Sequence, residues 1–171
     1  VGRFVAQKDY PTLMRAFALV RKERPARLLI LGEARKPRRR ERLLELAKQL
    51  GVADDVELPG HVRNPMAYMT RAAVFALSSS WEGLPGVLIE ALACGCPVVA
   101  TDSPGGSSEI LAGGAYGRLV PIGDPEALAK ALLATLDEPR QEARQKLRAA
   151  HFSVDASADS YLDALCSVAR A

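Results

Sequence analysis

The stretch SSSWEGLPGVLIEALACGCPVVATD, residues 78–102, reads as a strand end, a turn, a helix and a second strand. The expected helix, about Gly86–Cys94, is apolar nearly all round, and a helix that is apolar on every side is predicted to be buried. Two carboxylates interrupt this pattern, because Glu82 lies just before the helix and Glu90 lies in its middle. A buried carboxylate without a partner is costly, so this pair is the first candidate for a functional site.

The apolar pattern on either side of this stretch alternates between two periods. Short runs such as residues 26–32 and 73–79 have the length of buried strands, whereas residues 10–23 and 124–136 repeat apolar side chains at helical spacing. Strands that are apolar on both faces and alternate with helices are typical of a parallel sheet covered on both sides. We therefore expect an α/β fold, a Rossmann-like three-layer domain with a parallel sheet of about six strands.

Several local signals place helix ends within this pattern. Gly51 is expected to stop the helix before it, and Pro65 suits the first turn of a short helix. Asp124 is the expected N-cap of a helix whose first residue is Pro125. Beyond it we predict a charged helix over residues 140–150 and a C-terminal helix within residues 151–171.

The length, composition and charge of the chain limit the classes of protein to which it can belong. The chain has 171 residues, 49% of them apolar and 25% charged, which suits one soluble domain. A net charge of +3 does not by itself imply nucleic acid, and no apolar run approaches the roughly 20 residues of a membrane helix. The chain opens on VGRFV without a Met, so we expect a fragment of a longer protein.

Three cysteines, an odd number, predict free thiols in a reducing compartment and hence a cytoplasmic protein. Cys94 and Cys96 are interpreted as small core residues, because no second pair of ligands follows them. The sequence has no G-x-G-x-x-G, no G-x-x-x-x-G-K-[ST], no D-x-D and only two histidines. The strongest sequence cases for a dehydrogenase, a P-loop enzyme or Ser–His catalysis are therefore absent.

The carboxylate pair lies where an α/β sheet binds ligands, at the carboxyl ends of its strands. Glu82 in the loop and Glu90 in the second turn can converge, because helical side chains lean toward the N-terminus. The helix N-terminus suits phosphate, and Gly83 and Gly86 let the backbone approach a ligand closely. Carboxylates only accept hydrogen bonds and so suit hydroxyl groups. Phosphate and hydroxyls in one site describe a nucleotide sugar.

The alternative for Glu90 is structural, since a core Arg or Lys would also satisfy a carboxylate in a buried helix. The sequence leaves both readings open.

Four segments of the chain together resemble one enzyme family. EGLPGVLIE (82–90) is similar to its E-x7-E motif, and VGRFVAQKDYPTLMRAFALV (1–20) is similar to its G-R-x-x-x-x-K segment. ALACGCPVVATDSPGGSSEIL (91–111) and GRLVPIGDPEALAKAL (117–132) are similar to two further segments. On these motifs the chain resembles the retaining glycosyltransferases of group 1, also called family 4, which have the two-domain GT-B fold. Asp9 departs from the pattern, because Gly is frequent there.

The resemblance implies a role for each matching position. Arg3 and Lys8 would contact the donor diphosphate, Glu90 the ribose hydroxyls and Glu82 the hydroxyls of the donor sugar. A group of positions with backbone contacts to the phosphates and the sugar would comprise Gly83, Leu84, Pro85, Gly86 and Val87. The loop that flanks the base would comprise His61, Val62 and Arg63. Glu109 matches the glutamate after the family's glycine pair.

The resemblance also implies that the full enzyme has two domains with different functions. Residues 1–171 would be the nucleotide-sugar-binding C-terminal half of a GT-B fold, without the N-terminal acceptor domain. The full enzyme would transfer a hexose from a nucleotide-diphosphate sugar, with UDP favoured, to a glycan or lipid-linked glycan with retained stereochemistry. It would need no metal and no cofactor, and it would serve glycan, capsule or lipopolysaccharide assembly. The alternatives are a nucleotide-sugar 2-epimerase and a non-catalytic sugar-nucleotide binding module.

The segment EARKPRRRER, residues 33–42, stands out for its positive charge at or before a helix N-terminus. The simpler interpretation is a solvated loop. The alternative is that Arg35–Arg42 face an anionic acceptor or the inner face of a membrane, to which the protein would bind peripherally.

Overall fold

The computed structural model of the chain describes residues 1–33 and 37–169. Five strands are β1 (Leu28–Leu31), β2 (Val56–Gly60), β3 (Phe75–Leu77), β4 (Val98–Thr101) and β5 (Arg118–Val120). The first four helices are α1 (Tyr10–Glu23), α2 (Pro37–Gln49), α3 (Pro65–Arg71) and α4 (Gly86–Ala93). The others are α5 (Ser107–Ile110), α6 (Pro125–Asp137), α7 (Glu142–Ala150) and α8 (Val154–Ala169). Short 3-10 turns cover Ala6–Lys8 and Ala53–Asp55.

All strand pairs are parallel, as predicted, but the strands form two sheets. β1 pairs with β2, and β3, β4 and β5 form a second sheet in that order. Residues 1–33 and 37–169 thus contain five strands where we expected about six. The segment before residue 6 is extended, and among the described residues its bonds to the end of β1 are Gly2 N to Leu31 O and Phe4 N to Glu33 O. These isolated bonds do not make a strand ladder.

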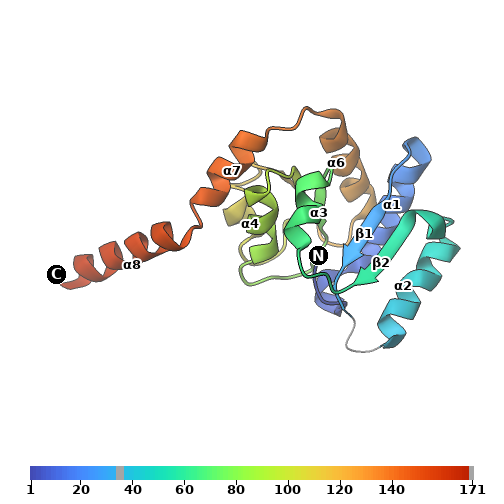
Figure 1. Ribbon diagram of the computed structural model, residues 1–171, viewed down its shortest axis with the longest axis horizontal. Coiled ribbons are helices and arrows are strands. Elements are labelled where there is room, and N and C mark those ends of the chain that lie inside the picture. Colours follow the sequence, from blue (N-terminus) through green and yellow to red (C-terminus); the bar gives the residue numbers. More distant parts are fainter. Residues whose placement is uncertain (34–36, 170–171) are drawn as a thin grey trace.

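The predicted three layers are present, because the strands separate two hydrophobic clusters. Val99 packs into the cluster that contains α1, α2 and α6, whereas its neighbours Val98 and Ala100 pack into the cluster that contains α3, α4 and α7. Alternate residues of a strand face opposite sides of a sheet, so β4 lies between the two helical layers. Figure 1 shows α1 and α6 together on one side and α3 and α4 on the other.

The local signals for helix ends are confirmed. The side chain of Asp124 accepts a hydrogen bond from Ala127 N, and Pro125 opens α6. Pro65 opens α3, where Asn64 is the N-cap. Gly51 follows the end of α2 with a φ of 70°, a left-handed conformation that glycine adopts at little cost.

The prediction that α4 is buried on every side is wrong. Leu88, Ala91 and Leu92 are buried, but the other faces are half-buried or exposed, and Glu90 is half-buried. The helix lies on one face of the sheet, so only one of its faces reaches the core. Glu90 therefore has access to solvent and does not require a partner in the core.

The C-terminal helix is present as α8 and projects from α7 away from the rest of the chain (Figure 1). Its exposed side chains include several large apolar groups, namely Val154, Tyr161, Leu162 and Leu165. Of the three cysteines, Cys96 is buried, Cys94 is partly buried and Cys166 is exposed on α8. Over residues 1–33 and 37–169, no helix is long and apolar enough to cross a membrane.

Candidate donor site

An ion pair joins two of the predicted site residues across the fold. Lys8 Nζ lies 2.6 Å from Glu82 Oε1, and the side chains are only 16% and 8% exposed. Lys8 ends the 3-10 turn before α1, and Glu82 lies in the turn between β3 and α4. The two residues are 74 positions apart in the sequence, so the fold alone brings this cation and this carboxylate together.

Two further side chains hold the carboxylate of Glu82. Ser79 Oγ donates to Glu82 Oε1 at 2.6 Å, and Gln7 Nε2 donates to Oε2 at 3.3 Å. With Lys8, three donors therefore converge on one carboxylate. A carboxylate offers about four lone-pair sites, so one remains for a hydroxyl of a ligand. Burial with three donors also explains how the charge of Glu82 is tolerated.

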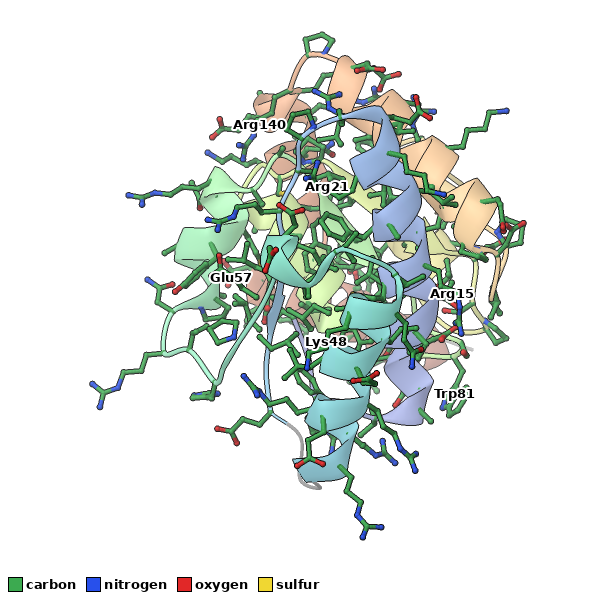
Figure 2. The ribbon with its side chains drawn as sticks, turned by 90° about the vertical axis from the view of Figure 1, so that its right-hand side faces the viewer. Arg15, Arg21, Lys48, Glu57, Trp81 and Arg140 are labelled. Atoms are coloured by element: carbon green, nitrogen blue, oxygen red, sulfur yellow. The ribbon has the colours of Figure 1, made fainter. Side chains whose placement is uncertain are left out.

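Backbone contacts join the Lys8 segment to the end of β3. Ser78 Oγ donates to the carbonyl of Lys8 at 2.8 Å, and Ser80 N donates to the carbonyl of Gln7 at 2.8 Å. Gln7 Nε2 also donates to the carbonyl of Trp81 at 2.9 Å. Figure 2 shows Trp81 beside the lower end of α1. The serine run of residues 78–80 thus fixes where Lys8 meets Glu82.

The departure at Asp9 has a structural explanation. Asp9 has φ 40° and ψ 50°, in the left-handed region that glycine adopts most easily. Asp tolerates this region better than most residues, and its side chain accepts a hydrogen bond from Thr12 N as the N-cap of α1. The substitution therefore preserves the turn that presents Lys8.

The loop after β4 clamps the turn that carries Glu82. Glu82 N donates to the carbonyl of Pro104 at 3.0 Å, and Gly106 N donates to the carbonyl of Gly83 at 2.7 Å. Gly105 has φ 114°, and a Cβ there would lie 1.9 Å from the carbonyl oxygen of Glu82. Only glycine fits such a position. Gly105 and Gly106 therefore allow the loop after β4 to pack directly against the backbone of the turn that carries Glu82.

The N-terminus of α4 opens next to this turn. Among the described residues no side chain caps α4, whose N-cap is Pro85. Gly83 and Gly86 are exposed, Leu84 is 58% exposed, Pro85 is buried and Val87 is half-buried. Gly86 N and Leu88 N donate to the carbonyls of Leu84 and Pro85, so Val87 N is the first-turn amide that can bind an anion. The site therefore combines a helix N-terminus, a lysine and a carboxylate.

Glu90 lies within electrostatic reach of the start of the chain. Its charge raises the pKa of the Val1 amino group, while the charge of Lys8 lowers it. Burial is the largest influence, and the net result is a pKa lowered to about 6. Glu90 and Lys8 therefore both lie near Val1.

We expect the 171-residue chain to lose stability as the pH falls from about 8 to 6. The pKa of the Val1 amine is lowered from 8.0 to about 6, so in this window the unfolded chain binds a proton that the folded chain does not. The free energy of unfolding then rises with pH, by up to about 3 kcal/mol across the window, and this contribution is complete above pH 8.

Urea unfolding at pH 6 and pH 8.5 would measure this difference. The N-acetylated chain is the control, because it lacks the titrating amine and should lose this part of the pH dependence. An unchanged pH dependence after acetylation would contradict the assignment to Val1.

The remaining predicted residues lie at the edge of the site. Arg3 is exposed on the extended segment that precedes the 3-10 turn. His61 and Arg63 are exposed and Val62 is half-buried, in the loop after β2. Glu109 is exposed on α5, where its carbonyl accepts a hydrogen bond from Arg148 Nη2 at 2.6 Å. Glu82 and Lys8 are thus in contact, whereas the roles of these five residues stay predictions.

Sequence reasoning missed three residues that build the site, namely Gln7, Ser79 and Gly105. Gln7 and Ser79 bind the carboxylate of Glu82, and Gly105 allows the close approach of its loop. Of these residues, only Gly105 could be noticed in the sequence, because it and Gly106 form the glycine pair of the segment 91–111. A Gln and a Ser have no distinctive spacing, and their contacts depend on the three-dimensional fold.

The basic segment has a partly structural role. Arg39 Nη1 donates to the carbonyl of Phe4 at 3.0 Å, and Arg40 Nη2 donates to the carbonyl of Leu58 at 3.2 Å. Arg38 and Arg42 are exposed in the first turns of α2, and residues 35 and 36 lie outside the described residues. The arginines that bond to carbonyls help to fix α2 against the ends of the strands.

Two other features bear on chemistry at this edge. Burial, and second the charge of Glu82, raise the pKa of Tyr10, whose hydroxyl donates to the carbonyl of Gly2 at 3.0 Å. Within the part of the chain that the structure describes, no three His, Cys, Asp or Glu side chains gather to hold a metal ion. Tyr10 is therefore a neutral support for the glycine next to Arg3.

Residues 1–152 match the family described as glycosyl transferases group 1. The chain belongs to the group 1 glycosyltransferases. One relative is the N-acetylgalactosamine-N,N'-diacetylbacillosaminyl-diphospho-undecaprenol 4-alpha-N-acetylgalactosaminyltransferase of Campylobacter jejuni, 34% identical over 87% of this chain and 40% of its own length. Another is a lipopolysaccharide core biosynthesis glycosyltransferase of Rhizobium meliloti, 33% identical over 98% of this chain and 48% of its own length.

Solved structures agree with the fold of this group 1 glycosyltransferase chain. Sucrose-phosphate synthase from Thermosynechococcus elongatus superposes with a TM-score of 0.84 at 29% identity, over 98% of this chain and 44% of that protein. The Anabaena protein HepE in complex with UDP superposes with a TM-score of 0.84 at 24% identity, over 97% of this chain and 47% of that protein. The chain thus has the fold of a GT-B C-terminal domain and spans less than half the length of these relatives.

Proposed function

We propose that this chain is the donor-binding domain of an enzyme that transfers a sugar from a nucleotide-diphosphate sugar. The observation that carries the proposal is the Lys8–Glu82 pair beside the uncapped N-terminus of α4. A cation and a helix N-terminus suit a diphosphate, and a carboxylate with a free lone pair suits a sugar hydroxyl. Family membership supports the same assignment.

In this proposal each group acts at a separate part of the donor. Lys8, Arg3 and the Val87 amide in the first turn of α4 bind the diphosphate and stabilise the negative charge that develops on it as the leaving group. Glu90 accepts from the ribose hydroxyls, and Glu82 accepts from a hydroxyl of the transferred sugar. The loop of residues 61–63 flanks the base, and Glu109 lines the sugar side. Transfer proceeds with retained stereochemistry and without a metal.

UDP is the proposed nucleotide. Anabaena HepE, with which this chain shares its fold, was solved with UDP-glucose. The acceptor would bind to a second domain and would be a glycan or a lipid-linked glycan, since the Campylobacter relative is named for a diphospho-undecaprenol acceptor. The exposed Arg38 and Arg42 add positive charge near the carboxyl ends of the strands, which suits a phosphate-bearing acceptor or an anionic membrane surface.

We expect the 171-residue chain to bind UDP but not to transfer sugar. Half of the proposed cleft is missing, so the dissociation constant should be about 0.1–1 mM. Calorimetry with UDP, GDP, ADP and uridine would rank the nucleotides and isolate the contribution of the phosphates. A transfer assay with the full-length enzyme is the comparison. Sugar transfer by the 171-residue chain alone would show that the second domain is not required, and full-length protein that binds UDP-sugar without turnover would make it a binding module.

A further inference from the structure

Three arginines spaced four positions apart accompany α7, the helix that packs against α4 (Figure 1). Arg140 lies just before α7, whereas Arg144 and Arg148 lie within it. Each of the three donates to a backbone carbonyl of another segment. Arg140 Nε bonds to the carbonyl of Gly95 at 2.9 Å, and Arg144 Nη2 bonds to the carbonyl of Ala115 at 2.6 Å. Arg140 thus holds the end of α4 that lies opposite the candidate donor site.

Arg148 makes two such bonds, and both go to the C-terminal end of α5. Its Nη2 donates to the carbonyl of Glu109 at 2.6 Å, and its Nε donates to the carbonyl of Ile110 at 2.8 Å. The last carbonyls of a helix have no partner within the helix, and a cation suits this end of the helix dipole. The guanidinium also lies over the rings of Tyr116 and Phe152, 5.5 and 4.9 Å from their centres. These contacts fix the orientation of the arginine fork that holds α5.

The opposite end of α5 is bonded to the turn that carries Glu82. Gly106 is the N-cap of α5, and its N–H donates to the carbonyl of Gly83 at 2.7 Å. Just before it, the carbonyl of Pro104 accepts from Glu82 N at 3.0 Å. The helix has four residues and, at about 1.5 Å per residue, is only about 6 Å long. A single helical turn therefore separates the bonds of Arg148 from the Glu82 turn.

A helix as short as α5 depends on other parts of the fold for its position. Ile110 and Leu111 are fully buried and anchor it in the core, but apolar burial is not directional. The hydroxyl groups of Ser103 and Ser107, on either side of the glycine pair, are buried, and no described residue bonds to them. These two side chains therefore do not orient the segment. The two bonds from Arg148 supply directional contacts that set where α5 ends.

We propose that Arg148 is a positioning residue for the donor site, which holds the loop of residues 104–106 against the turn that carries Glu82. The proposal rests on the proposed function, because it takes Glu82 to contact the transferred sugar. Arg148 itself touches neither the sugar nor the nucleotide and acts through α5. A displacement of about 1 Å at the reacting groups is enough to slow a reaction by about 100-fold. None of the residues proposed to bind UDP lies on α5, so loss of Arg148 should lower kcat more than the affinity for UDP.

The structure offers a matched control on the same helix. Arg144 lies over the same Tyr116 ring, 5.3 Å from its centre, and also bonds to a carbonyl at 2.6 Å. That carbonyl belongs to Ala115, which lies outside α5. Arg144→Met therefore removes a similar set of contacts without releasing the end of α5. Differences between Arg148→Met and Arg144→Met report on α5.

Kinetics of the full-length enzyme test the functional part of the proposal. A panel of UDP-sugars that includes UDP-glucose supplies the donor, and calorimetry with UDP measures nucleotide affinity. We expect Arg148→Met to lower kcat per folded molecule by about 10-fold or more, with the dissociation constant of UDP changed by less than about 2-fold. Arg148→Lys should give an intermediate kcat, because one ammonium group replaces the two-pronged fork. Arg144→Met should keep a kcat close to that of the wild type.

Hydrogen exchange tests the structural part without any donor. In the full-length enzyme, we expect Arg148→Met to speed exchange of the Glu82 and Gly106 amides at least about 10-fold, because both bond across the contact between the loop and the turn. Arg144→Met should leave these two amides unchanged.

The two measurements separate the possible failures. A lowered melting temperature with normal kcat in Arg148→Met would overturn the proposal, as would equal effects of Arg148→Met and Arg144→Met on kcat and on exchange. If Arg148→Met does not fold, Arg148→Lys decides, and a kcat and exchange rates equal to those of the wild type would overturn the proposal. A wild-type enzyme that neither binds UDP nor turns over any UDP-sugar would contradict the proposed function instead. Exchange at Glu82 and Gly106 would then still show whether Arg148 holds the turn.

Discussion

Glu82→Gln in the full-length enzyme is expected to lower turnover by about 100-fold or more, equivalent to about 2.7 kcal/mol. The change preserves the shape of the side chain and its contact with Ser79 but removes the negative charge. In the proposed site that charge positions a hydroxyl of the transferred sugar. In the proposed site the nucleotide makes no contact with Glu82, so we expect the affinity for UDP not to fall, and to rise if Lys8 is freed from its counter-ion.

Three measurements on this one variant separate a functional from a purely structural Glu82. Turnover, UDP affinity and melting temperature are compared with those of Glu126→Gln, a matched change at an exposed glutamate of α6. Normal turnover per folded molecule with a lowered melting temperature would show that Glu82 only stabilises the fold. Weaker UDP binding would show that Glu82 acts on the nucleotide after all.

Lys8→Met is expected to have two separable effects on the domain. It leaves the carboxylate of Glu82, 8% exposed, without its cation, and removing one partner of such a buried pair costs about 3 kcal/mol of stability. It also removes a cation from the diphosphate, so UDP binding should weaken much more than uridine binding. Lys130→Met, at an exposed position of α6, is the matched control and should change neither property.

The double variant Lys8→Met/Glu82→Gln distinguishes these effects. It removes both charges, so it should regain most of the stability lost in Lys8→Met while UDP binding stays weak. Recovery of UDP affinity together with stability would mean that Lys8 only supports the fold. Equal losses for uridine and UDP in the single variant would contradict the assignment of Lys8 to the phosphates.

Local and periodic features of the fold were predictable from the sequence, because they depend on neighbours in the chain. The cap at Asp124, the stop at Gly51 and the parallel α/β layers follow from such signals. The burial of α4 was not predictable in the same way. A helix that is apolar all round is predicted to be buried. Its apolar pattern does not tell, however, whether another element of the fold covers its outer face.

The sequence suggested the candidate residues of the site, whereas the contacts among them follow from the fold. The turn with Glu82, the glycines and the helix N-terminus follow one another in the sequence, so their proximity could be expected. The ion pair between Lys8 and Glu82 joins residues 74 positions apart, and Gln7 and Ser79 complete it without any motif. The sixth strand could be expected from the alternation of elements but is not among the strands of the structure.

The central claim is that the nucleotide diphosphate binds between Lys8 and the N-terminus of α4. Titration of the ¹⁵N-labelled domain with UDP, followed by amide chemical shifts, tests it most directly, because millimolar affinity is sufficient and each amide reports its own position. We expect the largest saturating shifts within residues 82–88 and around Lys8, and we expect Lys8→Met/Glu82→Gln to raise the UDP concentration needed to reach them. Saturating shifts confined to β1, β3 or α8, or no shifts at 10-fold above the expected dissociation constant of about 1 mM, would contradict it.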